Sequence, residues 1–248
     1  VQGPFTVRQS INLHKLLVAP IYVAMIWYFG GDLSLRQTWG PAAAALLICH
    51  GTYGFLWVYK DIYFPDASWT QATSVLGFIS CFVYPLGFYY TPMLCLVSPW
   101  FHFSSFGIGS EPWILAAGLW FYIVGMFYHY CADLQKHVQL AFERPRRLIT
   151  TELFAHMRNP NYFGEIMIYT GFAVLSMNWL PLVIFAAVWL QLFVPNMLAK
   201  EASMSRHAAW KDWVARTGLV YPWLPSLLKE FCANALSKKS SVAHAGAA

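Results

Sequence analysis

Long apolar runs constrain the fold of this chain more than any other feature of its sequence. A run of about 17 to 25 apolar residues is long enough to cross the hydrocarbon core of a bilayer as a helix. Runs of this kind lie at 13–30, 41–59, 71–90, 113–132, 162–178 and 180–199. Because only helices and closed barrels satisfy their backbone hydrogen bonds in lipid, we predict an all-α, polytopic membrane helical bundle with about six transmembrane helices.

One further apolar stretch, Thr91 to Phe103, is short and contains Pro92 and Pro99. These features predict a re-entrant or interfacial segment, with a seventh span as the alternative. No internal repeat or linker divides the sequence, so we expect a single integral membrane domain over residues 1–248. The small and polar residues at 238–248 predict a disordered tail.

The composition supports the membrane class. Of the 248 residues, 58% are hydrophobic and only 11% are charged, whereas soluble domains carry about 25% charged residues. The net charge of +5 does not indicate nucleic-acid binding, because the basic residues cluster beside apolar runs, where the positive-inside rule accounts for them. The five cysteines are odd in number and lack CxxC spacing, so they predict neither a disulfide framework nor a metal site.

Basic residues also predict the orientation. One basic zone lies between Asp133 and Arg158, and a second follows residue 199. The two runs between these zones return the chain to one side of the membrane, which we expect to be cytoplasmic. Counting back through six spans puts the N-terminus there too, and its first ten residues lack the apolar core of a removable signal peptide. We therefore predict a multi-pass protein with a cytoplasmic C-terminal segment, in the endoplasmic reticulum of a eukaryote or the inner membrane of a bacterium.

The segment 156–166 places four polar residues at the mouth of a predicted span: Arg158, Asn161, Tyr162 and Glu165. Ionisable groups at membrane depth are costly and usually functional. Asn161 and Glu165 are four residues apart and therefore share a helical face. We predict that they contact a ligand. An N-cap role for Asn161 and a helix-dipole role for Glu165 are the structural alternatives.

A second polar group lies near the end of the run at 113–132, where His129 and Asp133 share a helical face. The loop that follows carries three arginines, Arg144, Arg146 and Arg147. Guanidinium groups bind phosphates through paired N–H donors. Together with Arg158, these arginines predict a pocket for a pyrophosphate or a 2′-phosphate. Orientation by the positive-inside rule, or contact with anionic lipid heads, is the alternative.

The run RNPNYFGE at 158–165 resembles the signature that opens a late transmembrane helix in the membrane-embedded steroid 5-alpha-reductases and sterol C14/C7 reductases. The C-terminal stretch resembles the ending of the sterol reductases: Glu201 falls on an acidic position, Lys211-Asp212-Trp213 on a KDW segment, and residues 222–225 on a proline-containing close. The resemblance covers roughly residues 120–225. It implies an NADPH-dependent reductase of a carbon–carbon double bond in a steroid, sterol or other lipid.

The resemblance and the arginine pattern together imply eight cofactor-binding residues. They are Asp133, Arg146, Arg147, Arg158, Asn161, Tyr162, Glu165 and Glu201. The expected cofactor is NADPH. The expected partners are the lipid bilayer and a hydrophobic lipid substrate that enters from it.

The resemblance is incomplete where the substrate binds. The steroid 5-alpha-reductases use a Gln-Glu pair and a tyrosine of their early helices to bind and polarise the steroid ketone, and this sequence has no Gln-Glu pair. In the run at 41–59, His50 and Tyr53 are three residues apart and share a helical face. We predict that they are catalytic and orient or protonate the substrate. Packing is the alternative for both.

Two other functions fit parts of the sequence. The isoprenylcysteine and phospholipid methyltransferases share an Arg-His-Pro-x-Tyr-x-Gly segment and bind S-adenosylmethionine, and the segment from Arg158 to Gly164 fits that pattern except at Asn159. A transporter or structural membrane protein is the third reading, although no pair of broken helices in corresponding halves supports transport. Binding of NADPH, of S-adenosylmethionine or of neither distinguishes the three.

Overall fold

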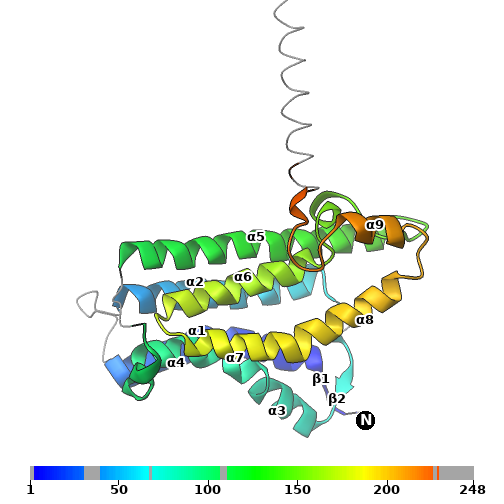
Figure 1. The fold of residues 1–248 in the computed structure, drawn as a ribbon. Helices are drawn as coiled ribbons and strands as arrows, with labels where there is room; N and C mark the ends of the chain where they lie inside the picture. The colour runs from blue at the N-terminus through cyan, green and yellow to red at the C-terminus, as the bar shows by residue number, and fades with distance from the viewer. Residues whose placement is uncertain (1–2, 31–39, 67–68, 107–110, 226–227, 229–248) are drawn as a thin grey trace, which may run out of the picture. The chain divides into compact units, whose positions relative to one another are not determined.

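The computed structural model describes residues 3–30, 40–66, 69–106, 111–225 and 228 (Figure 1). Within these residues the chain is helical almost throughout. Two strands of two residues each, β1 (Phe5–Thr6) and β2 (Ala72–Thr73), pair antiparallel. The all-α prediction is confirmed for this part of the chain. The predicted tail at 238–248 lies outside the described residues.

Five helical segments among the described residues are long and apolar enough to cross a membrane. They are Val7–Phe29, Gly40–Tyr63, Val75–Val97, Pro112–Phe142 and Leu180–Met204. The first, second and fourth correspond to α1 (Val7–Gly30), α2 (Gly40–Tyr63) and α5 (Pro112–Phe142). The fifth contains α7 (Leu180–Val188), the π-helical turn η5 (Trp189–Phe193) and α8 (Val194–Met204). The chain is an integral membrane protein by these criteria.

The third span corrects two predicted boundaries. It joins α3 (Val75–Val83), η2 (Leu86–Tyr90) and α4 (Thr91–Val97), so the span predicted at 71–90 begins later and runs on through Val97. Pro92 does not interrupt it, because it lies in the first turn of α4, where a missing N–H costs no helical hydrogen bond. Only the short η3 (Pro99–Ser104) remains of the predicted re-entrant segment.

The predicted span at 162–178 is α6 (Pro160–Leu175), and it is shorter than expected. With 16 residues it is not among the five segments that are long and apolar enough to cross a membrane, so the sixth predicted span is not confirmed. At 1.5 Å per residue the helix is about 24 Å long. Met177, with φ of 51°, stands in the turn that follows.

The chain divides into two compact units. Unit 1 comprises Val1–Phe127 and Gly164–Pro195, and unit 2 comprises Tyr128–Phe163 and Asn196–Ala248. Helices α5 and α6 therefore each contribute residues to both units. The segment of family resemblance, residues 120–225, coincides with neither unit.

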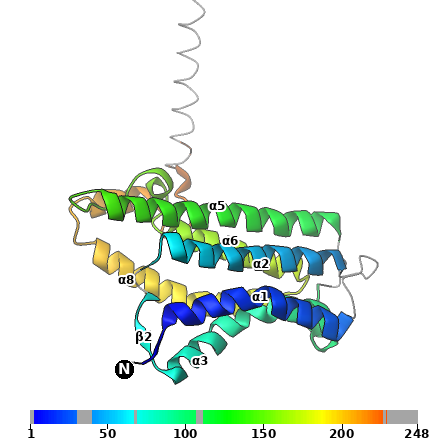
Figure 2. The ribbon, with the colours of Figure 1, turned by 180° about the vertical axis from the view of Figure 1, so that it is seen from behind.

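Glycines bring the helices of unit 1 close together. Helix α1 packs along α2 (Figure 2), and a Cβ on Gly54 would lie only 2.3 Å from the backbone oxygen of Lys15. Between α5 and α6, a Cβ on Gly125 would lie 2.6 Å from the Gly164 oxygen. Such contacts leave room for no larger side chain, so they fix which residues of neighbouring helices face one another.

Unit 2 has its own small core. It consists of Ala132, Phe154 and Trp213, with Leu148 and Trp210 among the partly buried residues around it. Trp213, in α9 (Trp210–Arg216), donates from Nε1 to the Phe154 oxygen at 2.8 Å, and Phe154 lies in η4 (Glu152–Ala155). The KDW segment therefore places its tryptophan in the core.

Candidate functional site

In unit 2, Arg158 is held by hydrogen bonds to Glu201 and Thr217. Its Nε donates to both carboxylate oxygens of Glu201, at 3.1 and 2.9 Å, and its Nη1 donates to the Thr217 backbone oxygen at 2.6 Å. The side chains of Arg158 and Glu201 are 10% and 16% exposed. The Glu201 carboxylate neutralises the charge of the Arg158 guanidinium. Arg158 is therefore less suited to bind a phosphate than an arginine without an acidic partner.

A tight loop holds the backbone beside Arg158. The Arg158 amide donates to the Gly218 oxygen at 2.9 Å, and the Gly218 amide donates to the His156 oxygen at 3.1 Å. A Cβ on Gly218 would lie 2.0 Å from the Tyr221 oxygen, so the turn requires glycine. The chain after α9 thereby pairs with the chain before α6.

Asn159, not Asn161, precedes α6. Asn159 is buried, its side chain donates to the Leu219 oxygen at 3.1 Å, and its own backbone oxygen accepts from the Phe163 amide. Because α6 begins at Pro160, Asn161 lies inside its first turn. The N-cap alternative for Asn161 is therefore removed.

His129 links two of the predicted cofactor residues. Its Nε2 lies 3.9 Å from Asp133 Oδ2, which confirms that the two side chains share a helical face. Its Nδ1 lies 3.4 Å from the backbone oxygen of Asn161. Next in the chain, the ring of Tyr162 lies under Lys200, whose Nζ is 4.4 Å from the ring centroid. The imidazole of His129 and the ammonium of Lys200 thus both contact residues of the first turn of α6 within unit 2.

The arginines of the loop at 144–147 differ from Arg158 in their contacts. Arg144 donates to the backbone oxygens of Leu140 and Glu143. Arg146 and Arg147 are exposed and make no ion pair or hydrogen bond with any described residue. These two guanidinium groups keep their full set of donors for an anion.

In unit 1, Lys15 is a buried cation inside an apolar bundle. It is 3% exposed, and its Nζ donates to the Tyr169 hydroxyl at 3.1 Å. The same Nζ lies 4.4 Å from the ring centroid of Tyr53, 5.0 Å from that of Trp57 and 5.1 Å from that of Tyr89. Burying an ammonium costs several kcal/mol, while a desolvated cation–π contact returns about 2 kcal/mol.

Sequence reasoning missed Lys15 as a site residue. A lysine inside an apolar run is itself a signal of function in membrane proteins. The sequence does not indicate the partner of Lys15, because Tyr169 is 154 residues away.

Tyr53 and Glu165, predicted for different roles, lie together. The Tyr53 hydroxyl donates to Glu165 Oε1 at 3.4 Å, and Tyr53 is fully buried. His50 lies on the same face of α2, because its ring centroid is 6.3 Å from that of Tyr53, and this confirms the predicted relation. Its Nδ1 lies 2.7 Å from the Tyr22 hydroxyl, and its ring stacks on Phe172 with centroids 4.3 Å apart.

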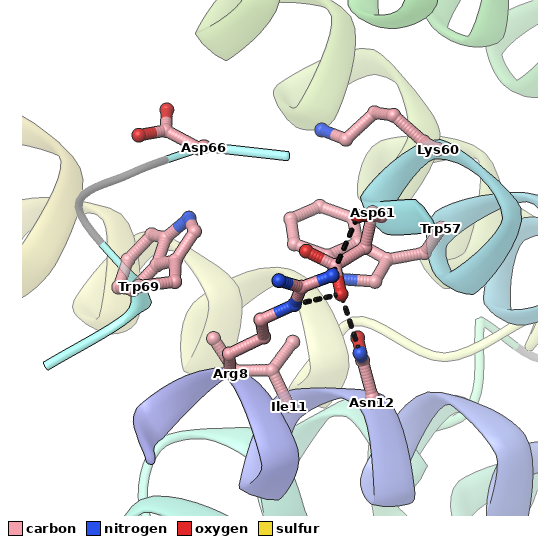
Figure 3. A pocket seen from close by; sticks show the side chains of 8 residues that line it. All are labelled: Arg8, Ile11, Asn12, Trp57, Lys60, Asp61, Asp66 and Trp69. Atoms are coloured by element: carbon pink, nitrogen blue, oxygen red, sulfur yellow. Dashed lines mark hydrogen bonds and ion pairs between the residues drawn. The ribbon is translucent and has the colours of Figure 1, made fainter. Parts of the chain in front are cut away.

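A small pocket opens beside this cluster, at the ends of α1 and α2 (Figure 3). Its empty volume is about 260 Å³, including the open mouth. It is lined by Arg8, Ile11, Asn12, Trp57, Lys60, Asp61, Asp66 and Trp69. Asp61 is paired with Arg8 and accepts from Asn12 at 2.6 Å. Trp57 belongs to both places, because it lines the pocket and its ring also contacts Lys15.

Comparison with known proteins gives one family. A family model described as a protein of unknown function (DUF1295) matches residues 68–217, well over half of the chain. The match contains the segment 156–166, the arginine loop and Trp213. Comparisons with curated proteins and with solved structures gave no match. The chain belongs to the DUF1295 family.

Proposed function

We propose that this chain is an NADPH-dependent reductase of an electron-poor carbon–carbon double bond in a steroid, sterol or other membrane lipid. The observation that supports it best is the buried polar cluster of unit 1, in which Tyr53 donates to Glu165 beside the ammonium of Lys15. Polar groups of this kind are costly in a membrane bundle and usually serve a reaction or transport path. The resemblance of residues 158–165 to the lipid reductases supports the choice of reaction.

NADPH, when bound, supplies a hydride. The substrate's double bond must then be conjugated to a carbonyl or similar group, which can take up the electrons that the hydride displaces. The protein's own residues have three tasks: to hold the carbonyl oxygen, to exclude water, and to give a proton to the neighbouring carbon. Tyr53, oriented by Glu165, is the proton donor in this proposal. The aromatic residues packed around it would exclude water from the reacting atoms.

The donors of unit 2 fit a phosphorylated nucleotide. Arg146 and Arg147 are exposed and have no partner in the part of the chain that the structure describes, and guanidinium groups suit the doubly charged 2′-phosphate. Asp133 and Asn161, both beside His129, would offer the carboxylate and amide groups that ribose and carboxamide recognition requires. The Arg158–Glu201 pair would hold the start of α6, which carries Asn161, rather than bind the cofactor directly.

The proposal is tested with purified full-length protein in lipid nanodiscs. Binding of NADPH, NADH and S-adenosylmethionine is measured first, and NADPH oxidation is then followed with a 3-oxo-4-ene steroid and with an unsaturated fatty ketone. The matched saturated ketones are the controls. We expect NADPH binding and oxidation that needs the double bond. Binding of S-adenosylmethionine without NADPH would replace the reductase by a lipid methyltransferase, and binding of neither would remove both enzymes.

The proposed reaction also bears on location. A lipid reductase with its nucleotide residues beside a basic loop would take NADPH from the cytoplasm. It would therefore work in the endoplasmic reticulum of a eukaryotic cell or in the inner membrane of a bacterium.

A further inference from the structure

We infer that Lys15 and Tyr169 form the site that holds the carbonyl oxygen of the lipid substrate, with Lys15 as a catalytic residue. The inference deepens the proposed function and rests on it for the reaction. Lys15 lies outside both the matched family segment and the segment of reductase resemblance, so neither assigns it a role. The argument comes from its surroundings in unit 1.

Lys15 has N–H donors that no described residue accepts. An ammonium group carries three N–H donors. Among the described residues, Lys15 makes one hydrogen bond, to the Tyr169 hydroxyl. Its other close neighbours are the rings of Tyr53, Trp57 and Tyr89, which attract the charge through their π faces. A buried cation with unused donors is suited to a ligand oxygen.

Tyr169 supplies the second half of the site. It is 1% exposed, and its ring stacks on Tyr89 with centroids 4.3 Å apart and planes at 8°. This packing fixes the position of its hydroxyl. Its hydroxyl accepts from Lys15 and is also hydrogen-bonded to the Tyr53 side chain. A phenol oxygen accepts one hydrogen bond and donates its proton in another, so a substrate oxygen that takes the place of Tyr53 would receive an N–H from Lys15 and the O–H of Tyr169.

Two such donors match the charge that the proposed reaction creates. When a hydride adds to the β carbon of an enone, the π electrons move to the carbonyl oxygen and form an enolate. The enolate collapses as the α carbon takes a proton, which restores the carbonyl group. Donors preorganised around the oxygen stabilise this charge in a water-excluded site. Tyr53 donates its single O–H to Glu165 before the reaction and would turn it to the α carbon to deliver the proton, so the two tasks fall to different residues.

The backbone supports this assignment. Gly54 allows α2 to approach the Lys15 backbone so closely that a Cβ would lie 2.3 Å from its oxygen. The approach aligns Lys15 with Tyr53, one residue before Gly54. Helix α6 brings Tyr169 one turn beyond Glu165. Both donor groups therefore sit on packed helices rather than on loops.

The test uses Lys15→Met, which keeps the length and apolar stem but removes the charge, with Tyr169→Phe as its partner. Lys60→Met is the matched control, because Lys60 is also a buried lysine of unit 1 whose Nζ lies over the Trp57 ring, at 4.3 Å. Each full-length variant is studied in nanodiscs for thermal unfolding, NADPH affinity, binding of a radiolabelled 3-oxo-4-ene steroid, and turnover of that steroid.

We expect Lys15→Met to lower turnover by about 10²- to 10³-fold, the loss that follows removal of one oxyanion donor. Steroid binding should weaken at least about tenfold, whereas NADPH affinity should stay unchanged. Lys60→Met should keep turnover. A structural role for Lys15 predicts the opposite: a lower unfolding temperature with turnover per folded protein intact, and that result overturns the inference.

The inference and the proposed function fail in different ways. If wild-type protein binds the steroid but does not oxidise NADPH, the reductase proposal fails. Steroid binding that still depends on Lys15 would then support the oxygen site, and binding independent of Lys15 would overturn it. If the wild type binds no carbonyl lipid, the oxygen site itself is overturned. Equal losses in Lys15→Met and Lys60→Met would also overturn it, because the effect would then belong to positive charge in general.

Discussion

Arg158 and Glu201 form a two-point ion pair across 43 residues of sequence, with Nε of the arginine 3.1 and 2.9 Å from the two carboxylate oxygens. The pair joins the loop before α6 to the end of α8 within unit 2. The same guanidinium also donates to Thr217, which follows α9. Three segments that are distant in sequence therefore meet at one side chain, and this gives the arginine a structural role.

Glu201→Gln should destabilise the protein. The amide keeps the size of the side chain but removes the charge that compensates Arg158, and loss of one partner of a buried pair costs about 3 to 5 kcal/mol, less at partial exposure. Thermal unfolding in detergent measures the effect. The double variant Arg158→Met/Glu201→Leu is the control and should recover much of the loss. A fully stable Glu201→Gln would show that the carboxylate is not needed to hold Arg158.

The fold could largely be predicted because apolar length is a local property. The five long helices all overlap predicted spans. The errors lie where local rules conflict. Pro92 predicts an interruption, but it lies in the first turn of α4, where a proline is compatible with the helix. Helix α6 ended early at Leu175, where the chain turns through Met177.

The candidate site was harder to predict because its contacts are not local. The i,i+4 relation of His129 and Asp133 followed from the sequence and is present. The partners of Arg158 and Lys15 are 43 and 154 residues away, and no helical periodicity encodes them. Charge type gives a partial signal of the Arg158–Glu201 contact, because the two residues have opposite charges and are both predicted to lie at the cofactor site.

Gly54→Ala tests how Lys15 is positioned. The new Cβ would meet the Lys15 oxygen at 2.3 Å, so α1 and α2 must separate. Overpacking of this kind costs about 1 to 3 kcal/mol. Thermal unfolding should show that loss, together with reduced turnover. Gly51→Ala is the matched control, because its Cβ meets only the Ala19 methyl group, at 3.2 Å. Equal effects in both variants would contradict a specific contact at Lys15.

Tyr53→Phe and His50→Ala should have opposite signatures. Tyr53→Phe removes only the hydroxyl that donates to Glu165, and loss of a positioned proton donor lowers turnover about 10²-fold or more. His50→Ala empties the space between Tyr22 and Phe172 and should lower stability by about 2 to 4 kcal/mol. Turnover per folded protein and the unfolding temperature are measured for both. A stable His50→Ala variant without activity would restore His50 as the proton donor.

The arginine loop should determine the preference for NADPH over NADH. If Arg146 and Arg147 hold the 2′-phosphate, changing both to Gln should weaken NADPH binding by about 1.5 to 3 kcal/mol per lost charged hydrogen bond, while NADH binding stays the same. Isothermal titration measures both affinities. Arg144→Gln is the control, because that side chain is bound to Leu140 and Glu143. Equal loss for NADPH and NADH would point to a general charge effect.

The Arg158–Glu201 pair also predicts how the chain crosses the membrane. The two residues are in contact, so the start of α6 and the end of α8 lie on one side of the bilayer. The segment Leu180–Met204 is long enough to cross, and the chain returns to the same side only if α6 crosses as well. Its short length is then accommodated by local thinning of the bilayer.

Single cysteines at Gln139, Trp179 and Ser205, in a variant without native cysteines, test this topology with a membrane-impermeant label. Gln139 and Ser205 flank the two crossings, and Trp179 stands in the turn between α6 and α7. We expect Gln139 and Ser205 to be labelled from one side, which the basic residues assign to the cytoplasm, and Trp179 from the other. Labelling of all three from one side would mean that neither segment crosses. Opposite labelling of Gln139 and Ser205 would be incompatible with the ion pair.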